Sequence, residues 1–105
     1  MYELYGSPEK FGLETVGEVD WSSGSYEFDL TVVWRRKSDG AFFFAEDSGC
    51  SCPSPFESVG VDDLMPVESL SEFHAHLTKR TGGNYYDRSE DTARLVERLH
   101  GMGLR

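Results

Sequence analysis

The residues best suited to chemistry are two cysteines and three histidines. Cys50 and Cys52 lie in the run DSGCSCPSPFE, residues 47–57, and the histidines are His74, His76 and His100. A structural zinc site takes four Cys or His ligands, and its paired cysteines are usually separated by two or more residues. A single residue separates Cys50 from Cys52, and side chains two positions apart on a helix project about 200° apart. The spacing therefore argues against a metal site. In the alternative interpretation, in which the protein binds a metal ion, the ligands are Cys50, Cys52 and His74.

Other catalytic chemistry has little support in the sequence. A cysteine becomes a nucleophile when a base or a helix N-terminus lowers its pKa, and no cysteine–histidine signature accompanies Cys50 or Cys52. The acidic pairs Glu46-Asp47 and Asp62-Asp63 are adjacent residues, which point to opposite sides of an extended chain and form no acid–base dyad. Phosphate-binding loops and nucleophile elbows are absent. We expect no enzyme activity and no cofactor.

The cysteine run also has the features of a recognition loop. Proline holds the preceding residue extended, and a stiff loop with an aromatic anchor loses little entropy on binding. The candidate binding residues are Asp47, Cys50, Cys52, Phe56 and Glu57. We prefer a structural interpretation, in which the run is a corner between a sheet and helices, Phe56 turns toward the core, both thiols pack as small apolar groups, and any recognition uses the exposed edge.

Acidic residues are unevenly distributed along the chain. The net charge is −9 over 105 residues, and Ser38 to Thr78 contains eight acids and neither Lys nor Arg. This pattern favours a partner with a basic surface and disfavours direct binding to nucleic acid, although acidity can also serve solubility alone. No apolar run approaches the roughly 18 residues of a membrane helix, and the start of the chain lacks the features of a signal peptide. We therefore expect a cytoplasmic protein without membrane contact.

Hydrophobic periodicity predicts an antiparallel three-stranded meander over residues 11–21, 26–36 and 41–46. In the central segment, apolar residues alternate with mostly polar ones, so we expect one buried face and one mostly exposed face. The apolar set is Tyr26, Phe28, Leu30, Val32 and Trp34. In the first segment, Val16 is out of phase with Leu13 and Val19, which indicates a bulge near Gly17.

The turn Ser38-Asp39-Gly40 predicts a hairpin, and its length decides which of Phe42, Phe43 and Phe44 face the core. A three-residue loop pairs Trp34 with Phe44, whereas a two- or four-residue loop puts Phe43 on the Trp34 face. We expect the three-residue loop with Gly40 left-handed, because it buries two phenylalanines beside Trp34.

Two helical stripes follow, over residues 67–80 and 89–100. Ser69 and Glu72 have capping-box spacing, and Ser89 is a good N-cap residue. Strands followed by helices favour the α+β class, with both helices packed on one face of the sheet. At this length we expect a single domain over residues 1–105.

The run at 47–57, the strand sequences at 30–35 and 41–45 and the opening SPEKFGLE at 7–14 together resemble a family of small proteins encoded by actinobacteriophages. The similarity covers about residues 7–70. That family is of unknown function, so the resemblance implies a bacteriophage gene expressed in the host bacterial cytoplasm and supplies no catalytic residue.

These observations lead to one expected function and two alternatives. We expect a non-enzymatic bacteriophage accessory protein whose acidic surface binds a host protein with a basic surface. The alternatives are a small metal- or thiol-dependent protein that uses Cys50 and Cys52, and a phage structural or assembly component. The sequence leaves the oligomeric state open.

Overall fold

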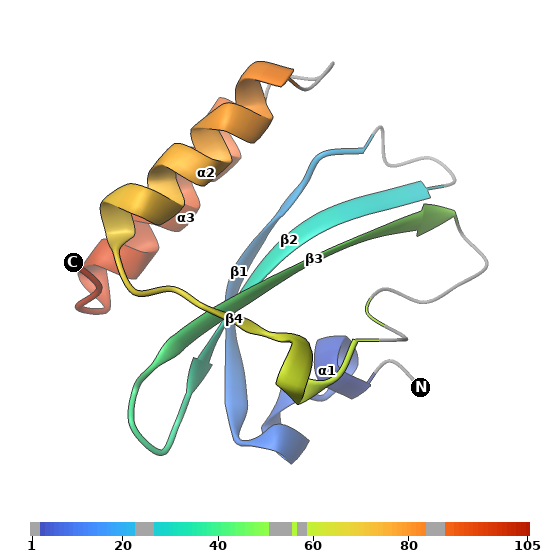
Figure 1. Cartoon of the computed structure of the whole chain (residues 1–105), viewed down its shortest axis with the longest axis vertical. Helices are drawn as coiled ribbons and strands as arrows, with labels where there is room; N and C mark the ends of the chain where they lie inside the picture. The colour runs from blue at the N-terminus through green and yellow to red at the C-terminus, as the bar shows by residue number, and fades with distance from the viewer. Residues whose placement is uncertain (1–2, 23–26, 51–55, 57–58, 84–87) are drawn as a thin grey trace.

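The computed structural model describes residues 3–22, 27–50, 56, 59–83 and 88–105. The elements in chain order are α1 (Glu3–Gly6), the 3₁₀ helix η1 (Pro8–Phe11), β1 (Leu13–Asp20), β2 (Glu27–Arg36), β3 (Phe42–Cys50), the 3₁₀ helix η2 (Val61–Asp63), β4 (Met65–Pro66), α2 (Leu70–Gly83) and α3 (Ser89–Gly101). The expected α+β class with two main helices is confirmed (Figure 1). Within the described ranges, none of the helices has the length and apolar character needed to cross a bilayer.

The antiparallel sheet has four strands in the order β1-β2-β3-β4, so the prediction of three strands was wrong. The added strand β4 pairs Pro66 with Phe43 and Met65 with Phe44. Two residues show no alternation, and proline is tolerated at a sheet edge because it donates no ladder hydrogen bond. β3 also continues past residue 46 to Cys50, so Asp47–Cys50 belongs to a strand that pairs with β2, and the corner begins later than expected.

Both faces of the sheet are buried, which corrects the expectation of one mostly exposed face. Thr31 and Val33, on the face expected to be exposed, are 0% accessible. This surface, which we call the helix face, packs against α2 and α3 through Phe73, Leu77, Leu95 and Leu99. The opposite surface, the second face, contains Leu30, Val32, Trp34 and Ala45 in a separate core with Leu4 and Phe56. Both main helices therefore cover one face, as expected, while α1 lies on the other side (Figure 1).

The β2–β3 hairpin has a four-residue loop, Lys37–Gly40, rather than three residues. Trp34 pairs with Phe43, and the Arg36 and Gly40 amides donate to the Ala41 and Arg36 carbonyls. Gly40 is left-handed, with φ of 76°, as expected. Asp39 accepts two hydrogen bonds from the Arg36 guanidinium, which, with the Ala41 amide, hold the pKa of Asp39 at about 2. These local bonds select the longer loop, and Phe42 and Phe44 consequently face the helices.

The predicted bulge in β1 is confirmed. The register against β2 shifts between Thr15 and Gly17, which leaves Val16 as the extra residue. The bulge places Leu13 in the second-face core and Val19 in the helix-face core. One inserted residue thus lets a single edge strand contribute to both cores.

The core of the second face depends on a small aromatic group. Phe56 is 1% exposed, stacks on Tyr5 with ring centroids 5.7 Å apart, and meets Trp34 edge-on at 5.4 Å. The Tyr5 hydroxyl donates to Glu18 Oε1 at 2.8 Å. Burial, this hydrogen bond and the charges of Glu18 and Asp20 raise the pKa of Tyr5 to about 12.

This shift predicts a tyrosine that ionises unusually late. Tyr5 stabilises the fold below the ordinary pKa of about 10, and we expect that contribution to disappear as pH rises through about 12. Ultraviolet titration of tyrosinate should contain a component near pH 12 that is missing from Tyr5→Phe. A difference between the two titration curves that develops near pH 10 instead of near pH 12 would contradict the assignment.

Candidate functional site

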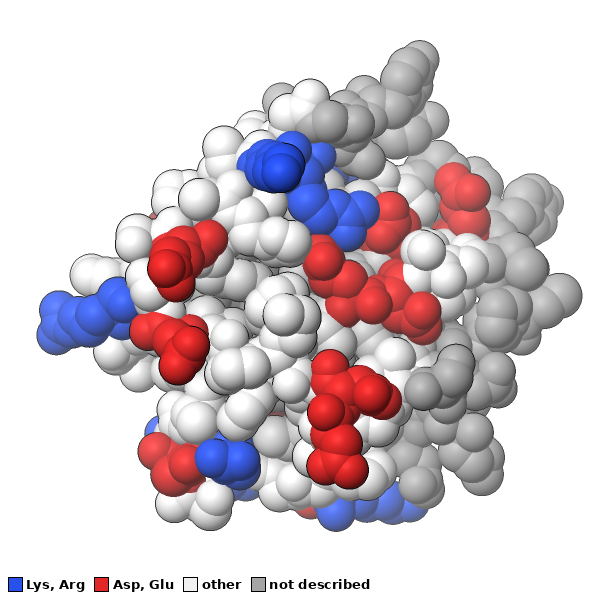
Figure 2. Space-filling model, in the orientation of Figure 1, with Lys and Arg blue, Asp and Glu red and all other residues white. Residues whose placement is uncertain are grey.

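Four exposed carboxylates lie in η2, in the segment between β4 and α2, and in the first turn of α2. They are Asp62, Asp63, Glu68 and Glu72, which together we call the acidic face. Figure 2 shows acidic side chains in separate patches around a largely uncharged centre on this side of the molecule. No lysine or arginine interrupts the sequence between Ser38 and Thr78. Four of the eight acids in this segment are therefore exposed between η2 and the first turn of α2, whereas Asp39 and Glu46 bind arginines of the chain.

A groove of about 190 Å³ opens on this side, between β4 and the start of α2. The lining residues are Phe44, Pro66, Val67, Glu68, Ser69, Glu72, Phe73 and His76. Phe44 and Phe73 pack with ring centroids 5.0 Å apart. The Val67 amide donates to the Phe42 carbonyl at 2.9 Å, which fixes the chain entering α2 beside the sheet. The groove thus has an aromatic floor and carboxylates on its rim.

A polar cluster joins the sheet to α2 beside this groove. Glu46 Oε2 accepts hydrogen bonds from Thr31 Oγ1 at 2.6 Å and Arg80 Nη1 at 3.0 Å, and lies 3.1 Å from His76 Nε2. Arg80 also donates to Asp29 Oδ2 at 2.8 Å. Its guanidinium lies 4.8 Å from the centre of the Trp21 ring. Charges from β2 and β3 therefore anchor the C-terminal half of α2 over the helix face.

Two opposing effects determine the protonation of Glu46. Desolvation by burial raises the pKa of Glu46, while hydrogen bonds from Thr31 and Arg80 and the neighbouring His76 imidazole lower it. The hydrogen bonds outweigh desolvation, and the pKa falls below its usual value. Glu46 consequently remains a carboxylate that accepts hydrogen bonds, and the cluster is better suited to fastening a helix than to donating protons.

The candidate residues of the cysteine run do not form one described site. Phe56 is buried, and its amide donates to Asp47 Oδ2 at 2.8 Å, which fits the structural interpretation. Cys50 is the last residue of β3. Cys52 and Glu57 lie outside the described residues.

The histidines occupy separate positions. His74 is exposed on α2 and His100 is exposed on α3, whereas His76 faces Glu46. Among the residues that the structure describes, no group of three or more His, Cys, Asp or Glu side chains has a metal-binding arrangement. That search does not reach Cys52, so the alternative metal set of Cys50, Cys52 and His74 stays a prediction.

Sequence reasoning missed the polar cluster and the groove. His76 and Arg80 are four residues apart and share one face of a helix. That spacing, with Asp29 and Thr31 on alternate positions of a strand, was the available signal. The groove depends on strand β4 and on the hairpin register, neither of which was predicted correctly.

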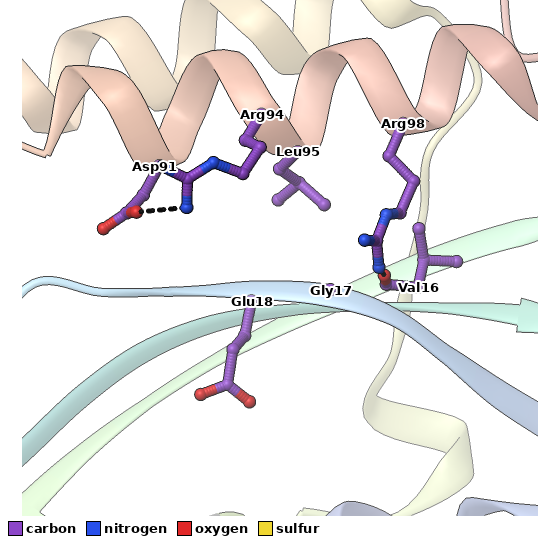
Figure 3. A pocket seen from close by; sticks show the side chains of 7 residues that line it. All are labelled: Val16, Gly17, Glu18, Asp91, Arg94, Leu95 and Arg98. Carbon is purple, nitrogen blue, oxygen red and sulfur yellow. Dashed lines mark hydrogen bonds and ion pairs between the residues drawn. The ribbon is translucent and has the colours of Figure 1, made fainter.

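A second cavity of about 180 Å³ lies between α3 and β1 (Figure 3). Arg98 donates to the Val16 carbonyl at 2.8 Å, and Arg94 bonds to Asp91 and Glu90. The Glu18 side chain points away from α3. A Cβ on Gly17 would lie 3.0 Å from Leu95, so glycine permits the close approach of strand and helix. Both arginines already donate hydrogen bonds to acceptors within the protein. We therefore attribute this cavity to the packing of α3 on β1.

Comparison with known proteins identifies a family and nothing more specific. Neither the curated proteins nor the solved structures contain a significant match to this chain. A family model described as a domain of unknown function, DUF7574, matches residues 2–102. This match extends over the groove, both main helices and every residue of the two cores except Leu104. The chain therefore belongs to the DUF7574 family.

Proposed function

We propose that this protein is a non-enzymatic binding module whose acidic face docks on a basic surface of a partner protein. The observation that carries the proposal is the acidic face itself, four exposed carboxylates within a segment of 41 residues that has no lysine or arginine. Surfaces of one sign accelerate association with oppositely charged partners and disfavour polyanions. The polar cluster supports the proposal because it fastens α2, one border of this surface, to the sheet.

The biological setting proposed for this interaction is infection of a bacterium. The resemblance of residues 7–70 to small actinobacteriophage proteins supports a phage accessory protein that acts in the host cytoplasm on a host protein. An acidic module of this size can occupy a basic surface that would otherwise bind another polyanion.

Docking by charge predicts strongly salt-dependent binding. Host proteins captured on the immobilised protein at about 50 mM salt should be released well below 1 M, because the screening length falls from about 8 Å at physiological ionic strength to about 3 Å at 1 M. Asp62→Asn/Asp63→Asn should release the same proteins at lower salt than wild type.

A control with the same change in charge is available on α3. Glu90→Gln/Glu97→Gln alters two exposed acids on the helix that packs against α2 and β1. This variant should retain its partners at salt concentrations close to those of wild type. Retention unaffected by salt, or equal loss in both variants, would contradict docking through the acidic face.

A further inference from the structure

We propose that the groove between β4 and α2 receives an arginine side chain of the partner protein. The inference rests on the proposed function and names the place where the partner protein is held most specifically. Phe44, Phe73, Glu68 and Glu72 would hold the guanidinium group.

The aromatic floor suits a flat cation. Arginine stacks on aromatic faces and is more weakly hydrated than lysine, so it loses less on entering a partly apolar groove. The protein already makes this contact twice within itself, with Arg36 4.9 Å from the Phe43 ring centre and Arg80 4.8 Å from that of Trp21. Phe44 is only partly buried and lines the groove.

The rim supplies uncommitted negative charge. Glu68 and Glu72 are exposed, and within the described ranges no ion pair engages either carboxylate. Other carboxylates, such as Glu14, Asp29 and Glu46, have an arginine of this chain within 3.0 Å. Charge-assisted bonds from a guanidinium to carboxylates are among the stronger polar contacts, so the rim complements the aromatic floor.

The start of α2 does not turn this groove into an anion site. The Leu70 amide donates to the Arg105 carbonyl at 2.9 Å, and the Glu72 amide donates to Ser69 Oγ at 3.4 Å. These two amides thus have acceptors within the protein, and the flanking carboxylates oppose the binding of a second anion. Charge complementarity therefore favours a cationic occupant.

The test uses a fluorescent peptide with several arginines spaced by glycine and serine, and a matched peptide with citrulline in their place. We expect the arginine peptide to bind the full chain and the citrulline peptide to bind at least about tenfold more weakly. Glu68→Gln/Glu72→Gln should weaken arginine-peptide binding about tenfold, whereas Asp62→Asn/Asp63→Asn, with the same change in charge, should weaken it about twofold or less. Phe44→Leu, which keeps an apolar side chain, should also weaken binding several-fold.

Three outcomes separate this inference from the proposed function. Equal weakening by the two acid pairs would overturn the groove while leaving charge-driven docking in place. Equal binding of a lysine version of the peptide would overturn the assignment to arginine. If the peptide leaves the ring signals of Phe44 and Phe73 unshifted in nuclear magnetic resonance spectra of the wild type, the groove is overturned even where Phe44→Leu proves poorly folded. If Asp62→Asn/Asp63→Asn loses its bound host proteins at the same salt concentration as wild type, that result would contradict the proposed function and leave the arginine groove in place.

Discussion

Replacing Phe56 by alanine is expected to lower the free energy of unfolding by about 3–5 kcal/mol. Phe56 is 1% exposed and fills the second-face core between Tyr5 and Trp34. Alanine would leave a cavity beneath α1 that rigid strands cannot close, so the loss includes both transfer and cavity contributions. Chemical denaturation at neutral pH measures the difference.

The backbone at this position makes the substitution informative. Phe56 has φ of 62°, and its amide and carbonyl bond to Asp47 Oδ2 and the Val59 amide. Alanine also carries a Cβ, so the cost of the left-handed conformation stays largely the same and the measured change reports on the ring.

The control is the same substitution at an exposed phenylalanine. Phe11, at the end of η1, is 41% exposed, and Phe11→Ala should cost less than about 1 kcal/mol. Comparable losses at the two positions would contradict the conclusion that Phe56 is a core residue.

Local patterns were sufficient to predict the class of the fold and several of its details. The bulge near Gly17 followed from the phase of Val16, and the orientation of Phe56 followed from its place after two prolines. The helix over residues 89–100 was predicted within one residue of the observed end at Gly101. Each of these features depends on a few neighbouring residues and their periodicity.

The errors arose where distant segments decide the structure. Thr31 looked like an exposed strand residue because threonine is polar, yet it is buried on the helix face, where Trp21 and Glu46 satisfy its hydroxyl. The three-residue hairpin loop was predicted because it would bury two phenylalanines beside Trp34. In the structure, Phe42 and Phe44 instead lie on the opposite face and pack in the helix-face core. β4 exists only because β3 offers it an edge. Tertiary packing therefore overrode local polarity and local length arguments.

The same limitation applies to the candidate site. Attention to cysteines and histidines favoured a short run of sequence, but the groove is assembled from β3, β4 and α2. In the sequence, Glu68 and Glu72 are ordinary surface acids. Only the fold shows that they line a groove together with Phe44 and Phe73. Of that site, the acidic segment alone was visible in the sequence.

Replacing Thr31 by valine is expected to destabilise the protein by about 2–4 kcal/mol although the two side chains are nearly isosteric. The Thr31 hydroxyl accepts the Trp21 indole N–H at 2.9 Å and donates to Glu46 Oε2 at 2.6 Å. Valine leaves a buried donor unsatisfied, and Glu46 loses a charge-assisted bond at the junction with α2. Amide hydrogen exchange in α2 should accelerate by more than the decrease in the global free energy of unfolding alone predicts.

The pH dependence of this loss distinguishes the role of Glu46 from simple packing. The pKa of Glu46 is lowered in the folded protein, so its contribution is present above its ordinary value of 4.5 and is lost as pH falls through the lowered value. The difference in the free energy of unfolding between wild type and Thr31→Val should therefore become smaller at acidic pH. Thr15→Val, the same change at an exposed position of β1, should cost less than about 0.5 kcal/mol at every pH. A pH-independent loss at Thr31 would leave Trp21 as its sole important partner, and the carboxylate would then contribute little to holding α2 on the sheet.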